Sequence, residues 1–214
     1  MSVYIKFCGI TNYEDAKNSL DLGVNYLGFN FYKKSKRYID AIEAKLITRR
    51  LPPSISSVGV FVNLEKNEID TIAREVSLDT IQLHRDENLD FCKSWNELKV
   101  IKALRIGLGG HDKQDCEDFL KVTEHILLDK YSSREFGGTG KEIKESLLEE
   151  LGEDILSRSF LSGGLTPENV AKKVKRFKPF AVDVASGIET EGDVRKKDLD
   201  KMREFVRVLT EISE

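Results

Sequence analysis

Eight short apolar runs cross the sequence at fairly regular intervals, and a longer amphipathic segment follows each of them. The apolar runs predict strands over 3–8, 25–31, 56–62, 79–83, 99–105, 125–129, 159–163 and 180–184. The intervening segments predict helices over 12–21, 40–50, 65–75, 86–97, 112–122, 141–151, 167–177 and 195–212. Strands that alternate with helices in this way are typical of βα units that form a parallel sheet.

Eight successive βα units predict an α/β fold, the (β/α)8 TIM barrel. The strands of such a barrel are buried on both faces, which suits runs as apolar as these. A doubly wound open sheet is the alternative, although it normally has fewer strands, and no G-x-G-x-x-G motif opens the first βα turn to bind a dinucleotide. No Gly/Ser-rich linker divides the chain, so we expect a single domain over residues 1–214.

The composition indicates a globular protein without a nucleic-acid-binding surface. Hydrophobic residues make up 40% and charged residues 33% of the chain, and the formal net charge is −3. No apolar run is long enough to span a membrane, and no signal peptide is recognisable, so we expect a cytoplasmic protein. Either a monomer or a homodimer is compatible with the sequence.

The three cysteines predict neither a disulfide framework nor a metal site. Cys8, Cys92 and Cys116 are widely spaced, odd in number and form no C-x-x-C motif. The histidines and acidic residues also lack metal-ligand spacing. Cys92 and Cys116 fall in helix-like segments and are expected to pack in the core. Cys8 ends the first strand, where it serves either packing or chemistry, since a thiolate is both a base and a nucleophile.

In a (β/α)8 barrel the functional residues lie at the carboxyl ends of the strands. Asp129 ends the sixth apolar run, "ILLD", where it either caps a turn or acts as a general acid or base. Asp183 lies in the eighth run. Strand alternation places Lys6 on the same face as Cys8, so we expect Asp183 to pair with Lys6 inside the barrel and to support the substrate-binding site.

The loops after the last two strands predict a phosphate site. Gly163 and Gly164 precede a helix, and Ser186 and Gly187 follow a strand. Glycines let backbone N–H groups approach an anion, and the N-terminus of a helix favours negative charge. Two tight turns that need positive φ angles are the alternative interpretation. The same two loops frequently hold phosphate groups in barrel enzymes.

Two further side chains are candidates for substrate binding. Arg37 lies in the basic loop "KKSKR", and its planar guanidinium would fit a carboxylate on the substrate. His84 follows the fourth strand, "IQL", and would also face the site. We expect His111 and His125 to have structural roles, because neither of them ends a strand.

Eight blocks of the sequence occur in the order found in one enzyme family. They are "KFCGIT", "GFNFYKKSKRYI", "VGVFVN", "IQLH", "ILLD", "GGTGK", "LSGGLTPENV" and "VDVASGIET". Together they make the chain resemble phosphoribosylanthranilate isomerase of tryptophan biosynthesis over nearly its whole length. The resemblance implies a TIM barrel that performs an Amadori rearrangement on a small phosphorylated substrate, without a cofactor or a metal.

The resemblance also implies residue roles. Cys8 corresponds to the general base of the family and Asp129 to the general acid, while Arg37 is expected to meet the anthranilate carboxylate. The sequence departs from the family at Arg85, where a glycine is usual, and after "GGTGK", where Ile143, Lys144 and Glu145 replace an aromatic run. Two alternatives stay open: the histidine-pathway ribonucleotide isomerase, which normally uses two aspartates, and a non-catalytic barrel that binds a phosphorylated sugar.

Overall fold

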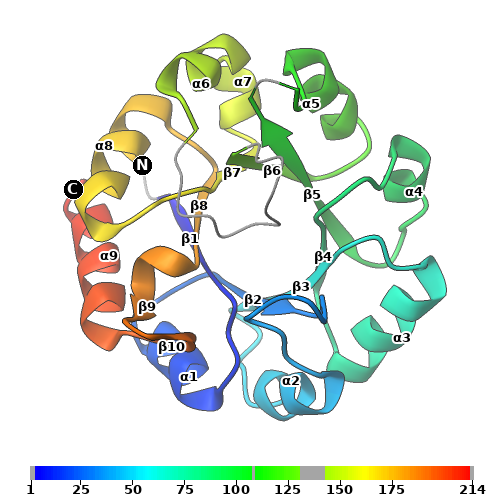
Figure 1. The fold of residues 1–214 in the computed structure, drawn as a ribbon, viewed down its shortest axis with the longest axis vertical. Helices are drawn as coiled ribbons and strands as arrows, with labels where there is room; N and C mark the ends of the chain where they lie inside the picture. Colours follow the sequence, from blue (N-terminus) through cyan, green and yellow to red (C-terminus); the bar gives the residue numbers. More distant parts are fainter. Residues whose placement is uncertain (1–2, 108, 131–142, 213–214) are drawn as a thin grey trace.

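Eight parallel strands form a closed ring at the centre of the protein, as the sequence predicts (Figure 1). The computed structural model describes residues 3–107, 109–130 and 143–212. The strands are β1 (Tyr4–Cys8), β2 (Tyr26–Asn30), β3 (Ser56–Phe61), β4 (Thr80–Leu83), β5 (Lys99–Ile106), β6 (His125–Lys130), β7 (Ser159–Leu161) and β8 (Ala181–Val184). The ring closes where β1 pairs with β8, with Lys6 opposite Asp183.

Helices surround the ring on its outer side (Figure 1). They are α1 (Tyr13–Asp21), α2 (Ala41–Thr48), α3 (Lys66–Val76), α4 (Leu89–Lys93), α5 (Lys113–Leu120), α6 (Glu145–Leu151), α7 (Glu153–Leu156), α8 (Pro167–Phe177) and α9 (Leu199–Glu211). None of these helices is long and apolar enough to cross a membrane.

Several of the helices begin at capping residues that the sequence supplies. Asn12 accepts a hydrogen bond from the backbone N–H of Asp15 at the start of α1. Thr166 and Asn169 form a reciprocal capping box at the start of α8, and Pro167 occupies the first helical position. These caps fix where each loop ends, and therefore where the residues after the strands can lie.

Two layers of apolar side chains hold the barrel together. The larger cluster packs the strands against the surrounding helices and includes Phe7, Phe29 and Phe205, which are fully buried. The smaller cluster fills the barrel interior with side chains from alternate strand positions: Val58, Ile101, Ala103, Leu127, Phe160 and Ala181. The barrel interior is therefore packed with apolar side chains, and the polar residues at the carboxyl ends of the strands lie above this layer.

The segment 86–97 differs from the prediction of one long helix, because α4 spans only Leu89–Lys93. The carboxylate of Glu87 accepts hydrogen bonds from the backbone N–H groups of Asn63 and Arg85 and pairs with buried Lys102 at 2.7 Å. These bonds hold the preceding residues in a loop, and Asn88 then caps the helix. Glu87, inside the predicted helix, is used for tertiary contacts instead.

The segment 195–212 also differs, since its first residues belong to a strand. A short 3₁₀ turn, η1 (Ser186–Ile188), leads from β8 into a hairpin of β9 (Glu189–Thr190) and β10 (Asp193–Lys197). Asp198 then caps α9 through the N–H groups of Asp200 and Lys201. The hairpin lies between β8 and α9, near α1 (Figure 1).

Candidate active site

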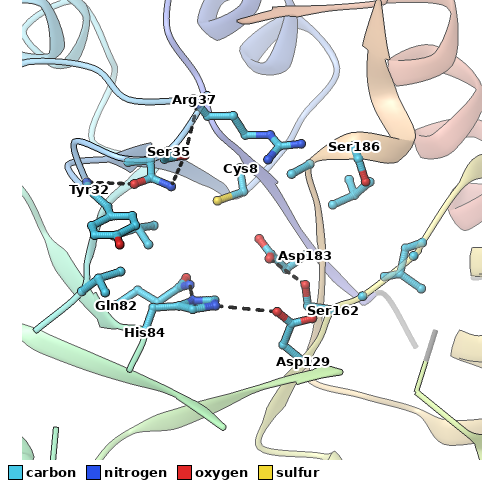
Figure 2. A pocket seen from close by; sticks show the side chains of 18 residues that line it. Cys8, Tyr32, Ser35, Arg37, Gln82, His84, Asp129, Ser162, Asp183 and Ser186 are labelled. Atoms are coloured by element: carbon cyan, nitrogen blue, oxygen red, sulfur yellow. Dashed lines mark hydrogen bonds and ion pairs between the residues drawn. The ribbon is translucent and has the colours of Figure 1, made fainter. Parts of the chain in front are cut away.

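One pocket at the carboxyl ends of the strands collects nearly all the residues that the sequence singled out (Figure 2). Those predicted residues that line it are Cys8, Arg37, His84, Asp129, Gly163, Gly164, Asp183 and Ser186. Asn30, Tyr32, Ser35, Gln82 and Ser162 also line it, and sequence reasoning had not assigned them a role at the site. The pocket is thus built from residues on, or just after, every strand of the ring except β5.

Cys8 lies at the end of β1 with its sulfur beside a buried ammonium group. Lys6 is fully buried, and its Nζ donates a hydrogen bond of 2.7 Å to Asp183 Oδ1. Burial opposes the charged form, but Asp183 and Cys8 together keep the pKa of Lys6 above its ordinary value. The predicted pairing of Lys6 with Asp183 is confirmed, and it places a fixed cation next to the thiol.

A glycine on the neighbouring strand makes this arrangement fit. A Cβ atom at Gly28 would lie 2.7 Å from Cys8 Sγ and 3.1 Å from Lys6 Nζ. Both distances are shorter than ordinary contacts, so the absent side chain provides the space that the sulfur and the ammonium group occupy. On the other side of the ion pair, Ser162 donates a hydrogen bond of 3.0 Å to Asp183 Oδ2.

Asp129 enters the pocket from β6, on the side opposite to Cys8. The two strands are separated by β7 and β8 in the ring, and Figure 2 shows Asp183 between the two side chains in this view. The carboxylate of Asp129 is mostly buried and lies 3.6 Å from His84 Nε2. A hydrogen bond from the N–H of Lys130 to Oδ1 orients it further.

His84 is oriented in turn by the residue two positions before it on β4. Gln82 Nε2 lies 2.7 Å from His84 Nδ1, so the two side chains point into the same pocket, as strand alternation requires. Gln82, His84 and Asp129 therefore form a continuous polar row along one wall (Figure 2). Gln82 could have been found from the alternation alone, because it is a polar residue between two apolar ones, Ile81 and Leu83, near the carboxyl end of the strand.

The loop after β2 holds Arg37 in place. Asn30 donates a hydrogen bond of 3.2 Å to Ser35 Oγ, which also accepts one of 3.1 Å from the backbone N–H of Arg37. The guanidinium of Arg37 pairs with Glu189 of the hairpin through two hydrogen bonds. The lysines of this basic loop, Lys33, Lys34 and Lys36, are not among the residues that line the pocket.

The two glycine-containing loops meet at the pocket, with different roles for their glycines. Gly163 and Gly164 have φ angles of +87° and +66°, which only glycine adopts readily, and both line the pocket. Gly187 does not line it. A Cβ there would lie 2.0 Å from the carbonyl oxygen of Leu165, so Gly187 lets the loop after β8 pack against the loop after β7.

Other residues considered from the sequence lie away from the pocket. Cys92 and Cys116 are buried, and burial raises the pKa of these thiols to about 11 and about 12, which confirms packing roles. Arg85 pairs with Asp86 at 3.2 Å and does not line the pocket. Ile143 is buried, whereas the "GGTGK" block lies at 137–141, outside the described residues.

The described part of the chain contains no cluster of three or more histidine, cysteine, aspartate or glutamate residues that could hold a metal ion. The pocket instead offers a thiol beside a cation, a carboxylate on the opposite wall, a guanidinium and two glycine-containing turns. Such a set can move protons between two points on one small anionic molecule.

Comparison with known proteins gives consistent results. The family model described as N-(5'phosphoribosyl)anthranilate (PRA) isomerase matches residues 5–208. The N-(5'-phosphoribosyl)anthranilate isomerase of Trichlorobacter lovleyi is 39% identical over 212 residues, covering 96% of this chain and 97% of that protein. The isomerase of the same name from Thermotoga maritima is 41% identical over 206 residues, with coverages of 96% and 97%.

One solved structure is similar to this chain in both fold and sequence. It is phosphoribosyl anthranilate isomerase in complex with reduced 1-(o-carboxyphenylamino)-1-deoxyribulose 5-phosphate. It is 39% identical, has a TM-score of 0.82, and the match covers 98% of this chain and 99% of that one.

Proposed function

Because the chain belongs to the N-(5'-phosphoribosyl)anthranilate isomerase family, we propose that it converts N-(5-phosphoribosyl)anthranilate to 1-(2-carboxyphenylamino)-1-deoxyribulose 5-phosphate in tryptophan biosynthesis. The observation that carries the proposal is that Cys8 and Asp129 line one pocket from strands three places apart in the ring, with Asp183 between their side chains in Figure 2. An Amadori rearrangement needs an acid at the ring oxygen and a base at the neighbouring carbon, and these two side chains can reach both sides of one sugar.

The substrate would be bound at its two anionic ends. Its phosphate would lie at the loops after β7 and β8, on the backbone of Gly163 and Gly164 and near Ser186. Its anthranilate carboxylate would meet Arg37, across the mouth of the pocket. Binding at both ends would place the ribose ring between Cys8 and Asp129.

Asp129, in its protonated form, would start the reaction. It would give its proton to the ring oxygen while the bond between that oxygen and C1 of the ribose breaks, which leaves an iminium ion. The thiolate of Cys8 would then take the proton from C2, and the electron pair of that C–H bond would form the C1–C2 double bond of an enolamine. A proton added at C1 and one lost from the C2 hydroxyl give the ketone.

The surrounding groups support these two steps. The cation of Lys6 would face negative charge that forms on the sulfur, and Asp183, hydrogen-bonded to Ser162, holds that cation in place. His84 lies against Asp129 and would orient its carboxyl group. Each positioned acid or base contributes about 10²–10⁴-fold to the rate of such reactions.

A steady-state assay with freshly generated phosphoribosylanthranilate tests the proposal. We expect the purified protein to consume the substrate, followed by the loss of its anthranilate-type fluorescence. Binding of the substrate without turnover at any pH would contradict the proposal and would favour a barrel that only binds a phosphorylated sugar.

We further propose a cytoplasmic location for this reaction. Cys8, Cys92 and Cys116 are all free thiols, which fits a reducing compartment. A monomer or a homodimer remains the prediction for the assembly state.

A further inference from the structure

We propose that Glu189, on the hairpin inserted between β8 and α9, is a positioning residue that decides which edge of the Arg37 guanidinium meets the carboxylate of the substrate. The inference rests on the function proposed above, because it concerns the same substrate. It assigns to the hairpin a role in selecting an aromatic amine that carries a carboxylate.

The ion pair between the two side chains uses one edge of the guanidinium. Arg37 Nε lies 2.5 Å from Glu189 Oε1, and Nη2 lies 3.0 Å from Oε2. A guanidinium has five N–H donors in a fixed plane, and this contact takes two of them. The other edge, formed by Nη1 and the second N–H of Nη2, makes no hydrogen bond within the described residues. A carboxylate can therefore bind Arg37 end-on, in the plane of the guanidinium.

Arg37 is also fixed along its aliphatic part. Gly9, the residue after Cys8, has a φ angle of +75°, and a Cβ there would lie 2.6 Å from Arg37 Cδ. The side chain thus lies directly against the backbone that follows β1. Arg37 is thus held along its aliphatic part by Gly9 and at its guanidinium by Glu189, and Figure 2 shows it on the same side of the pocket as Cys8.

Glu189 is itself held firmly. It is buried, and its Oε1 lies 3.3 Å from Nζ of Lys197, whose side chain is fully buried on the other strand of the hairpin. Lys201 of α9 donates a hydrogen bond of 2.8 Å to the backbone oxygen of Glu189. The N–H of Lys197 binds Asp15 of α1 at 2.9 Å. The hairpin is therefore tied to two helices and does not need the substrate to order it.

This arrangement has a cost that a purely structural ion pair would not explain. A carboxylate beside Arg37 weakens the attraction of the guanidinium for a second carboxylate, yet Arg37 lines the substrate pocket. Glu189 compensates for this weaker attraction because it orders the Arg37 side chain before the substrate binds. Binding of the substrate carboxylate to the other edge of the guanidinium then costs little further side-chain entropy. The expected result is selectivity for a ring carboxylate in one plane, rather than general attraction of anions.

The test compares two ligands on wild-type protein and on Glu189→Gln. The first ligand is reduced 1-(2-carboxyphenylamino)-1-deoxyribulose 5-phosphate, and the second is the same compound without the ring carboxylate. Isothermal titration calorimetry gives the ratio of their Kd values. We expect wild-type protein to prefer the first ligand by about 100-fold, from two charge-assisted hydrogen bonds. Glu189→Gln should reduce this preference about tenfold, with the affinity for the second ligand unchanged.

Two further variants separate positioning from loss of the fold. Glu191→Gln is the matched control, because Glu191 is an exposed carboxylate on the same hairpin, and it should leave the preference unchanged. Arg37→Ala should abolish the preference, and adding Glu189→Gln to it should have no further effect, because Glu189 acts through Arg37. In steady-state kinetics, Glu189→Gln should raise KM and leave kcat within about threefold.

Glu189→Gln leaves the fully buried side chain of Lys197 without its carboxylate partner, which can destabilise the variant. If thermal melting shows Glu189→Gln unfolded, the double variant Glu189→Gln with Lys197→Met removes both charges and takes the place of Glu189→Gln in the same titrations. A folded variant with the wild-type preference overturns the inference. Absence of turnover by wild-type protein would instead overturn the proposed function, so the two failures are distinguishable.

Discussion

Lys6 and Asp183 form an ion pair across the joint between β1 and β8, with Lys6 Nζ 2.7 Å from Asp183 Oδ1 and next to the sulfur of Cys8. The pairing of β1 with β8, which closes the barrel, therefore also places a cation beside the thiol of Cys8. Burial of a charged lysine costs free energy unless an opposite charge lies beside it. Here that charge is the carboxylate of Asp183, which itself lines the pocket.

Removal of this charge should make the thiol less reactive. In the double variant Lys6→Met with Asp183→Asn, the sulfur has lost the buried ammonium group beside it together with the carboxylate that held that group, so we expect alkylation by iodoacetamide at pH 7 to be slower than in wild-type protein. Mass spectrometry of the labelled peptides locates the reaction at Cys8. Cys92 and Cys116 serve as internal controls, since burial raises the pKa of both thiols. Alkylation at the wild-type rate would show that Lys6 has no electrostatic role.

Addition of a single methyl group at Gly28 should damage the site more than the fold. A Cβ there would lie 2.7 Å from Cys8 Sγ, so Gly28→Ala must displace the sulfur. We expect kcat/KM to fall by about 10²-fold, and a loss of about 1–3 kcal/mol in the free energy of unfolding. Gly192→Ala, in the exposed hairpin turn, is a control for kcat/KM only: nothing lies within 4 Å of the added Cβ, but the φ angle of +81° strains any side chain there. Unchanged kinetics of Gly28→Ala would contradict the tight placement of the sulfur.

The chemistry of Asp129 can be removed with little change in the size of the side chain, by substitution with asparagine. Asn cannot supply a proton to the ring oxygen, so Asp129→Asn should lower kcat by about 10²–10⁴-fold. The Kd of the reduced product analogue should change much less, because the side chain keeps its size beside His84. Asp154→Asn, on the exposed surface of α7, is the matched control. Activity of Asp129→Asn within about threefold of wild type would assign the acid to another residue.

The strands and the site at their ends could be predicted because both follow from local patterns. Runs such as "ILLD" are too apolar for a surface position, and a carboxylate at the end of one must face either a partner or a substrate. Cys8, Asp129 and Arg37 were placed together by the barrel topology alone, which requires all strand ends to meet at one edge.

The hairpin was not predictable in the same way. Its second strand, "DVRKK", is charged and short, and it reads as the first turn of the following helix. Its structure depends on partners outside the strand: Glu189 of the same hairpin binds the side chain of Lys197, and Asp15, 182 residues away in the sequence, binds its backbone. A pairing across this many residues leaves no periodicity in the sequence. The partner of Arg37 was therefore missed, although Glu189 stands in the quoted block "VDVASGIET".

The central claim is that the thiol at the end of β1 takes the proton from the sugar. The most direct measurement is the steady-state turnover of phosphoribosylanthranilate by Cys8→Ser beside wild-type protein, with calorimetric titration of the reduced product analogue on both. We predict that the variant loses at least about 10²-fold in kcat and binds the analogue with nearly the wild-type Kd, because a serine hydroxyl keeps the shape but not the base. Turnover by Cys8→Ser at a rate close to that of wild-type protein would contradict the account.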